Sequence, residues 1–182
     1  LTMYKAATTP KDPVKGVLDA LNHAAEYRGE NLKTLLSAGS MLIHGTTHAI
    51  NAIITGNTAK TAFLTTWGHP DILVLREAGR IEPFNFHIPY PAPYVPRALT
   101  FEIPERIGSA GEVMLPLDEA AAIDIIKKLK KLKVESVAVC FLGSIAEPDH
   151  ELRIGALLDK HLPGVPYTLS HRLNPALREY RR

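Results

Sequence analysis

The sequence predicts an α/β fold, in which apolar strands alternate with amphipathic helices. Two observations support this prediction. Residues 41–66 read as a buried strand, a helix and a second buried strand, an order that implies a parallel sheet with a crossover connection. Residues 119–170 continue as helix, strand, helix and strand. Because no internal repeat or low-complexity linker interrupts the chain, we expect one α/β domain over residues 1–182, with a mixed sheet and flanking helices.

The N-terminal residues predict a strand followed by a helix. Residues 1–8 are a short apolar strand candidate. Asp12 suits the N-cap of the helix that follows, and Pro13 suits its first turn, where a missing N–H costs nothing. Apolar residues then recur at helical spacing until Gly29, which ends the pattern.

A second helix and the strand–helix–strand unit come next. Residues 32–36 form a short helical turn. Met41–Ile43 is apolar at every position, as expected of a strand covered on both faces. His48–Thr55 is the helix that follows a Gly-Thr-Thr turn, and Thr61–Thr66 is the next buried strand.

The segment Glu82–Pro104 differs from the rest of the chain. It holds six of the fourteen prolines together with five aromatic residues, and proline at this density excludes a helix or a central strand. We predict an extended, aromatic-anchored arm that packs along the outside of the sheet domain and contributes to a contact with another lobe or subunit. It leads into a β segment at Leu99–Glu105, for which Glu112–Leu115 is the expected partner strand.

The second half predicts alternating helices and strands. Glu119–Leu132 is the clearest helix, with apolar residues on one face and lysines on the other. Val134–Leu142 is a buried strand, residues 149–162 form a helix, and Tyr167–Ser170 is a last short strand. We interpret Asp149–Glu151 as the start of a helix and not as a catalytic pair of carboxylates.

Composition narrows the classes of function. Hydrophobic content of 46% and charged content of 22% are typical of a globular chain, and a net charge of +2 argues against nucleic-acid binding. The lone cysteine, Cys140, excludes an internal disulfide and favours a reducing cytoplasm. No apolar run approaches the ~20 residues of a membrane span, and no signal peptide is visible. We expect a cytoplasmic protein that does not bind membranes.

The turn before the third helix is the first candidate site. Gly45 would let a ligand approach the backbone, while the Thr46 and Thr47 hydroxyls and the free N–H groups of the helix start would hold a phosphate or an acyl oxygen. The alternative is a threonine that only caps the helix. Asn51, one helical turn later, either points at the ligand or is a satisfied structural hydrogen bonder.

Histidines flank this turn. His44 and His48 are four residues apart, and together with His69 and Asp71 they raise the possibility of a metal site. His44 precedes the helix, however, so this spacing does not place both rings on one helix face. We therefore expect no bound metal and interpret His44 as a hydrogen-bonding residue beside the turn.

Charged residues follow the next strand. Arg76, Glu77 and Arg80 come after a break at Gly68 and form either a solvated loop or the rim of a site, because parallel sheets bind ligands at the carboxyl ends of their strands. Cys140 lies in an apolar strand, where a cysteine is usually inert.

Six longer segments form a recognisable series along the chain. They are KAATTPKDPVKGVLDAL (Lys5–Leu21), HGTTHAINAI (His44–Ile53), LTTWGHPDIL (Leu64–Leu73), PYVPRALTFEIPERI (Pro93–Ile107), AVCFLGSIAEPDHELRIG (Ala138–Gly155) and LSHRLNPALREYRR (Leu169–Arg182). In this order they resemble the hydantoinase/oxoprolinase family, which includes N-methylhydantoinase A subunits, 5-oxoprolinases and subunits of acetone and acetophenone carboxylases.

The resemblance implies part of the first lobe of the ribonuclease-H-like, actin-like ATPase fold. It implies ATP-dependent opening of a cyclic amide such as a hydantoin, 5-oxoproline or a lactam, with ATP and Mg²⁺ as cofactors. The related alternative is ATP-dependent carboxylation of a ketone. It also implies a second lobe and a B-type partner subunit.

One family feature is not in the sequence. The glycine-rich GxDxGGTxxD turn that binds ATP phosphates in this superfamily would precede Leu1, so we expect this stretch alone to bind ATP weakly and to be inactive. The general base and the metal-binding carboxylates are not visible. A non-catalytic module that holds substrate or forms an interface is the competing interpretation. A sugar or acid kinase would share the superfamily but not the segments above.

Overall fold

The computed structural model describes residues 2–77, 82 and 84–182, without the side chain of His48. The chain forms two compact units, which are described separately: the N-terminal unit, Leu1–Thr47, and the sheet unit, His48–Arg182. The expectation of one domain over residues 1–182 stays a prediction.

Two helices form the N-terminal unit, as predicted. They are α1, Pro13–Tyr27, and α2, Leu32–Ala38. The side chains of Asp12 and Asn31 cap them, each accepting a hydrogen bond from a backbone N–H in the first turn. These bonds satisfy donors that a helix start leaves without an intrahelical partner.

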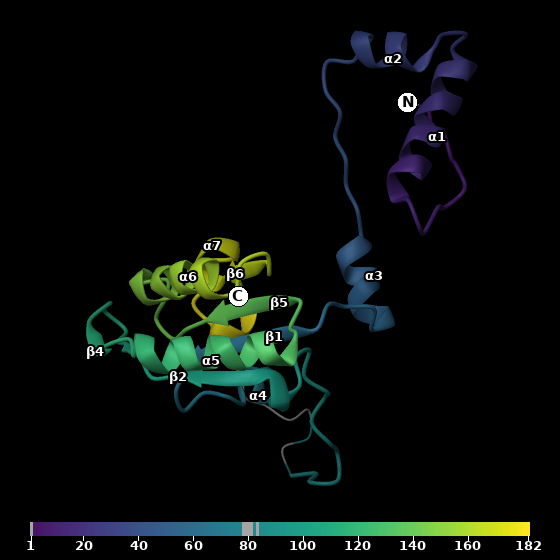
Figure 1. The fold of residues 1–182 in the computed structure, drawn as a ribbon. Coiled ribbons are helices and arrows are strands. Elements are labelled where there is room, and N and C mark those ends of the chain that lie inside the picture. Colours follow the sequence, from purple (N-terminus) through teal and green to yellow (C-terminus); the bar gives the residue numbers. More distant parts are fainter. Residues whose placement is uncertain (1, 78–81, 83) are drawn as a thin grey trace. The chain divides into compact units, whose positions relative to one another are not determined.

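A parallel sheet forms the centre of the sheet unit. Its strands are β1, Thr61–Thr66; β2, Thr100–Ile103; β5, Ser136–Cys140; and β6, Tyr167–Leu169. They lie in the order β2-β1-β5-β6, and all three pairings are parallel (Figure 1). This arrangement confirms the α/β class.

Antiparallel pairing is confined to a separate ribbon. It consists of β3, Arg106–Ile107, and β4, Val113–Leu115. The prediction that Glu112–Leu115 pairs with the β segment at Leu99–Glu105 is wrong, because β2 joins the parallel sheet beside β1 and leaves β4 to pair with β3.

Three of the helices in this unit were predicted. They are α3, His48–Thr55; α5, Glu119–Leu132; and α6, Asp149–His161. The sequence did not reveal the short elements α4, α7, η1 and η2. These span Ile72–Leu75, Ser170–Leu173, Arg97–Leu99 and Glu179–Arg181.

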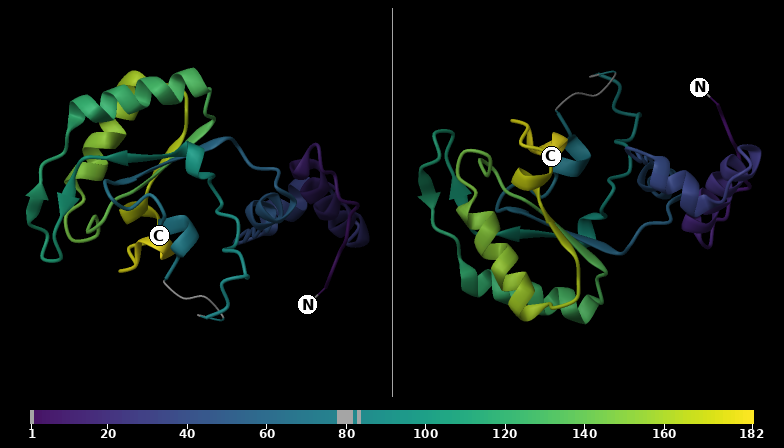
Figure 2. Two further views of the ribbon diagram at one scale, coloured as in Figure 1. Left: turned by 90° about the horizontal axis from the view of Figure 1, so that it is seen from below. Right: turned by 90° about the horizontal axis from the view of Figure 1, so that it is seen from above.

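Each face of the sheet has its own core. Ala62 and Leu64 of β1 are fully buried against α5 and α6, whereas Phe63 between them packs on the other face with α4. The ribbon shows α5 and α6 on one face of the sheet and α4 on the other (Figure 2). This alternation follows from the period of two in a β-strand. The helices contribute Ala122, Ile126 and Leu129 from α5 and Ile154 and Leu158 from α6.

Two strands predicted for the N-terminal unit are not formed. Residues 2–9 and 41–47 have no regular secondary structure. The side chains of Met41, Leu42 and Ile43 are 77%, 68% and 85% exposed, so the prediction of a buried strand there is wrong for this structure. An apolar run makes a strand possible, but its formation depends on pairing with distant residues, which a local pattern does not encode.

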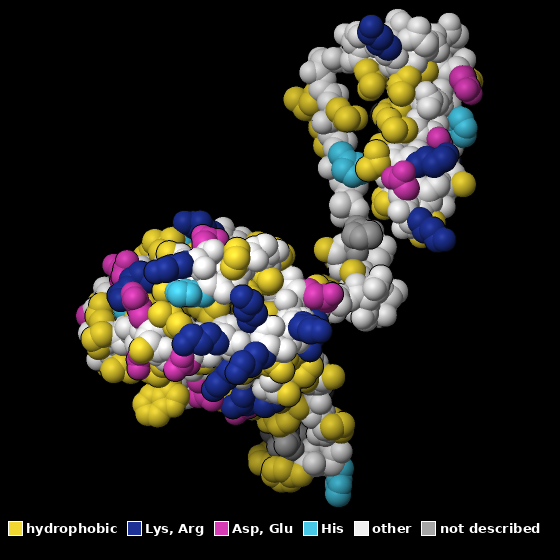
Figure 3. All heavy atoms as spheres, in the orientation of Figure 1, with side chains coloured by type: hydrophobic (Ala, Val, Ile, Leu, Met, Phe, Trp, Pro, Cys, Tyr) yellow, Lys and Arg dark blue, Asp and Glu magenta, His cyan; other side chains and the backbone are white. Residues whose placement is uncertain are grey.

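The proline-rich arm contains neither helix nor strand from residue 84 to residue 96, as predicted; Pro83 lies outside the described residues. Val95 anchors it against Phe63 on the α4 face of the sheet. The aromatic rings do not pack there: Phe84 is 90% and Tyr94 67% exposed. Hydrophobic side chains accordingly gather on the surface in the lowest part of the view in Figure 3, while lysines and arginines cover α5.

Candidate functional site

Buried polar side chains gather where the four parallel strands end. Thr66 is the last residue of β1, Glu105 follows β2, and Ser170 follows β6; all three are at most 5% exposed. We call this region the carboxyl edge. It is the edge at which open α/β sheets bind ligands.

Glu105 joins β2 to its neighbours. Its carboxylate accepts a hydrogen bond from the Thr66 hydroxyl and lies 2.8 Å from Nδ1 of His150 in the first turn of α6. The Thr66 oxygen in turn accepts from the N–H of Leu142, at 2.9 Å, just beyond β5. One carboxylate thus connects the ends of three strands to a helix.

Glu151, the next residue of α6, is completely buried and joins the end of β5 to the end of β6. Its carboxylate accepts hydrogen bonds from the Phe141 N–H at 2.9 Å and the Ser170 hydroxyl at 2.7 Å. Nδ1 of His171 lies 2.6 Å away. A buried carboxylate without such partners costs several kcal/mol, and the positive end of the α6 dipole adds to its stabilisation.

The sequence prediction missed this network. Asp149–Glu151 does begin a helix, as predicted, but the side chains of His150 and Glu151 point into the protein. A signal was present: Glu151 shares the helical spacing i, i+3, i+4, i+7 with the buried residues Ile154, Gly155 and Leu158. A carboxylate on the apolar face of a helix predicts a buried polar contact.

The turn after β1 holds a second polar group. Gly68 has a φ of 85°, and its N–H donates to the Glu102 carboxylate at 2.8 Å. Nη1 of Arg106 lies 2.9 Å from Nε2 of His69. Partial burial and the Arg106 charge lower the pKa of His69, which favours the neutral ring that accepts this hydrogen bond.

Arg76 and Glu77, predicted to be a site rim, contact the C-terminal segment. Glu77 pairs with the Nε and Nη2 atoms of Arg181, the latter at 2.8 Å, and this hydrogen bond lowers the pKa of the Glu77 carboxyl. The guanidinium of Arg76 lies 5.7 Å from the centre of the Tyr180 ring. Arg80 lies outside the described residues.

The structure places the other predicted site residues in exposed segments. His44, Gly45, Thr46 and Thr47 lie in the stretch without regular structure that ends the N-terminal unit, and α3 begins at the next residue, as predicted. A Cβ at Gly45 would meet nothing within 4 Å, so its backbone is open to close approach. Asn51 is exposed on α3. A ligand-binding role for these five residues stays a prediction.

The described residues contain neither a group of candidate metal ligands nor a helix that could span a membrane. Within the described part of the chain, no three or more His, Cys, Asp and Glu side chains cluster as metal ligands would. None of its helices is long and apolar enough to cross a bilayer.

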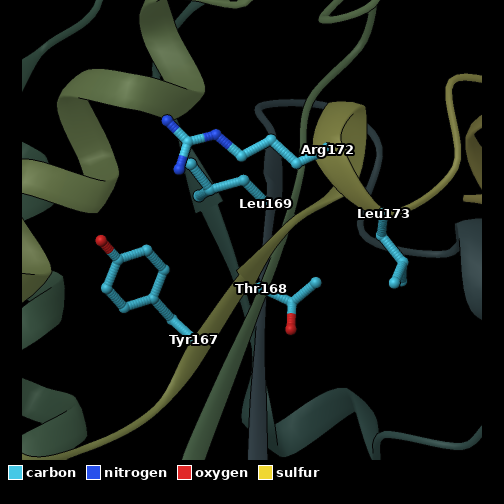
Figure 4. A pocket seen from close by; sticks show the side chains of 5 residues that line it. All are labelled: Tyr167, Thr168, Leu169, Arg172 and Leu173. Carbon is cyan, nitrogen blue, oxygen red and sulfur yellow. The ribbon is translucent and has the colours of Figure 1, made fainter.

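A hollow of about 260 Å³ lies at β6 and the start of α7 (Figure 4). Residues Tyr167, Thr168 and Leu169 line it together with Arg172 and Leu173 of α7. Successive strand side chains point to opposite faces, so a hollow that three successive residues line lies at the strand's edge. The hydroxyl of Tyr167 already donates a hydrogen bond to the Asp159 carboxylate at 3.0 Å.

The chain is similar to proteins whose names state an enzymatic activity. The family model for the hydantoinase/oxoprolinase N-terminal region matches residues 1–162. The chain is 34% identical over 182 residues to the caprolactamase alpha subunit of Pseudomonas jessenii. It is 28% identical over 191 residues to the acetophenone carboxylase gamma subunit of Aromatoleum aromaticum.

The crystal structure of the ATP-dependent caprolactamase from Pseudomonas jessenii superposes on 99% of this chain, with a TM-score of 0.83 and 32% identity. The chain spans 26% of the length of that protein and 26% of the carboxylase subunit. It therefore corresponds to about a quarter of each relative.

Proposed function

The chain belongs to the hydantoinase/oxoprolinase N-terminal region family, and on that premise we propose that it is part of an ATP-dependent hydrolase that opens cyclic amides of the hydantoin, 5-oxoproline or lactam type. The main support is the 34% identity, over 99% of the chain, to a caprolactamase subunit. The crystal structure of that relative is described as ATP-dependent, and we propose ATP as the cofactor of this protein too. We also propose Mg²⁺ as its second cofactor. We place the protein in the cytoplasm, where its lone cysteine would stay reduced.

In the proposed chemistry, the substrate oxygen would take the γ-phosphoryl group of ATP and ADP would leave, which converts a poor electrophile into a good one. Water would then attack the activated carbon, the ring C–N bond would break and phosphate would be released. Gly45 and the Thr46 and Thr47 hydroxyls would stabilise the negative charge that develops on that oxygen. His44 and Asn51 would complete the hydrogen bonding around it. The exposure of His44–Thr47 and the open space at Gly45 are compatible with this role.

The second candidate is a subunit of an ATP-dependent ketone carboxylase. It is favoured by the match to the acetophenone carboxylase gamma subunit, which covers 98% of this chain. Both relatives are named as subunits, so we also propose that a B-type partner subunit and a second lobe complete the site. The competing proposal is a non-catalytic module that holds substrate or forms an interface.

The test uses the protein assembled with its partner subunit. Wild-type protein is supplied with ATP and Mg²⁺ and with a lactam, a hydantoin, 5-oxoproline, or a ketone plus bicarbonate, and the products are identified by mass spectrometry. A ring-opened amino acid supports the hydrolase, and a β-keto acid supports the carboxylase. A stable phosphorylated substrate would instead indicate a kinase and would contradict both.

The same assay tests the proposed oxygen-binding residues. Replacing Thr46 and Thr47 with valine keeps their shape and removes both hydroxyls. We expect turnover to fall about 100-fold or more, the size expected when oxyanion donors are lost. Cys140→Ser should leave turnover within a few-fold. A silent threonine pair in a folded protein would refute the assignment.

A further inference from the structure

The last nine residues, 174–182, form a strap across the ends of β5 and β6. Arg182 holds it from beneath: its side chain has no exposed area and donates to Phe141 O at 2.9 Å and to Ser170 Oγ at 3.1 Å. The carbonyl oxygen of Glu179 lies 3.5 Å from the sulfur of Cys140. The strap therefore covers a thiol and a serine that belong to the carboxyl edge.

A different kind of contact holds the strap on its outer side. Arg181 and Glu77 form a two-point ion pair whose side chains are 61% and 35% exposed. We call this pair the latch. Water competes for both charges, and ion pairs of this exposure contribute little to stability.

Arg76, which precedes Glu77 of the latch, adopts an unfavourable backbone conformation and has a buried polar atom without a hydrogen-bond partner among the described residues. Arg76, next to Glu77, has a φ of 56° and a ψ of −124°, which a residue with a Cβ rarely adopts. Its Nε atom is buried and finds no hydrogen-bond partner in the described part of the chain. Departure of Tyr180, which lies over this guanidinium, would let water reach that atom. The closed state thus includes one unfavourable contribution that opening would relieve, a buried Nε atom of Arg76 without a partner among the described residues.

We propose that the strap is a gate over the carboxyl edge: it opens by release of the Glu77–Arg181 latch while the sheet stays folded. In the closed state, Arg182 occupies the acceptors at the ends of β5 and β6. In the open state, these acceptors and the Cys140 thiol face solvent. Access to the carboxyl edge is then controlled by the strap.

Cys140 provides a direct readout of opening. It is the one cysteine of residues 1–182, and in the whole protein its labelling is followed by mass spectrometry of the peptide that contains it. Burial raises the pKa of its thiol to about 11, so at pH 8 only roughly one thiol in a thousand would be the reactive thiolate while the strap is closed. Because Cys140 is also only 6% exposed, a thiol reagent reaches its sulfur chiefly when the strap moves away, and the labelling rate reports on opening.

The experiment measures the rate at which Ellman's reagent labels Cys140 at pH 8 in the whole protein. The variant Glu77→Gln keeps the shape of the side chain and removes the latch charge. We expect labelling to accelerate about 2- to 5-fold, the effect of losing one exposed ion pair, with an unchanged circular dichroism spectrum in the absence of urea, which shows that the protein stays folded. Arg182→Leu should accelerate it more than 10-fold, because charged buried hydrogen bonds are lost.

The matched control is Glu119→Gln. Glu119 also receives two hydrogen bonds from an exposed arginine, Arg153, but on the α5–α6 side of the sheet. This variant should label at the wild-type rate. The gate is refuted if Glu77→Gln labels no faster than Glu119→Gln. It is equally refuted if wild-type labelling rises with urea as steeply as global unfolding does, because exposure of Cys140 would then require the sheet to unfold.

Discussion

His171 and Glu151 are joined twice. Nδ1 of His171 lies 2.6 Å from Oε2 of Glu151, and the backbone N–H of His171 donates to the same oxygen at 3.2 Å. The first contact fixes the orientation of the ring, and the second fixes the backbone where β6 turns into α7. The carboxylate therefore positions a whole segment.

We predict that Glu151→Gln destabilises the protein by about 3–5 kcal/mol, because hydrogen bonds to its buried carboxylate are lost, at about 1.5–3 kcal/mol for each bond to a charged group. The amide has the same shape, but it has one acceptor oxygen where the carboxylate has two, so donors that now bind Glu151 lose partners. Urea unfolding monitored by circular dichroism would measure this loss. Glu119→Gln, at an exposed ion pair, should change the free energy of unfolding by at most ~1 kcal/mol. Equal small effects at both positions would show that the buried network contributes little.

The Cys140 thiol should make stability depend on alkaline pH. Burial raises its pKa in the folded state from 9.0 to about 11, so folding favours the neutral thiol. This stabilisation is fully present below pH 9 and is lost as pH rises through 11, up to about 2–3 kcal/mol. Urea unfolding at pH 8 and pH 11 should therefore show a steeper loss in the wild type than in Cys140→Ala. Parallel losses in the two proteins would contradict the prediction.

Protonation of His69 should make the protein less stable at acid pH. Its pKa is lowered by burial and by Arg106, so the folded state favours the neutral ring. This stabilisation is present above pH 6.5 and is lost as pH falls through the lowered pKa. A nuclear magnetic resonance titration should place the midpoint of His69 below 6.5, and Arg106→Met should raise it. A midpoint that Arg106→Met leaves unchanged would exclude the guanidinium as a cause.

The proline-rich arm should matter more for assembly than for folding. Phe84 is 90% exposed, so Phe84→Ser should change the free energy of unfolding by less than about 0.5 kcal/mol, whereas Phe63→Ala in the core should cost about 3–5 kcal/mol. If the arm contacts a partner, Phe84→Ser and Tyr94→Ser should weaken the assembled complex in size-exclusion chromatography. An unchanged complex together with a lowered melting temperature would place the arm in the core.

Local signals predicted the helices well. α5 begins and ends where the sequence indicated, because Asp118 caps it and its apolar residues keep a helical period throughout. α3 likewise spans His48–Thr55 as expected. These features depend on residues within one or two turns of each other, which a sequence displays directly.

Pairing between distant residues could not be predicted in this way. An apolar run such as Met41–Ile43 shows that a strand is possible, but it does not show which edge is vacant to receive it. The contacts of Glu105 with Thr66 and His150 join residues 39 and 45 positions apart, and no local pattern encodes them. The exposed candidate residues Thr46 and Thr47 came from a local motif, whereas the buried network at the carboxyl edge depends on the tertiary fold.

The position of β6 at the end of the sheet bears on aggregation. The N–H of Val137 donates to Pro166 O, so by the alternation of strand hydrogen bonding Thr168 also faces β5, while the backbone groups of Tyr167 and Leu169 face outward. Such an edge is a template for another chain to add a strand. It is only three residues long, because α7 begins at Ser170. Substitutions that replaced this first helical turn with continued strand would lengthen the template and favour intermolecular β-sheet.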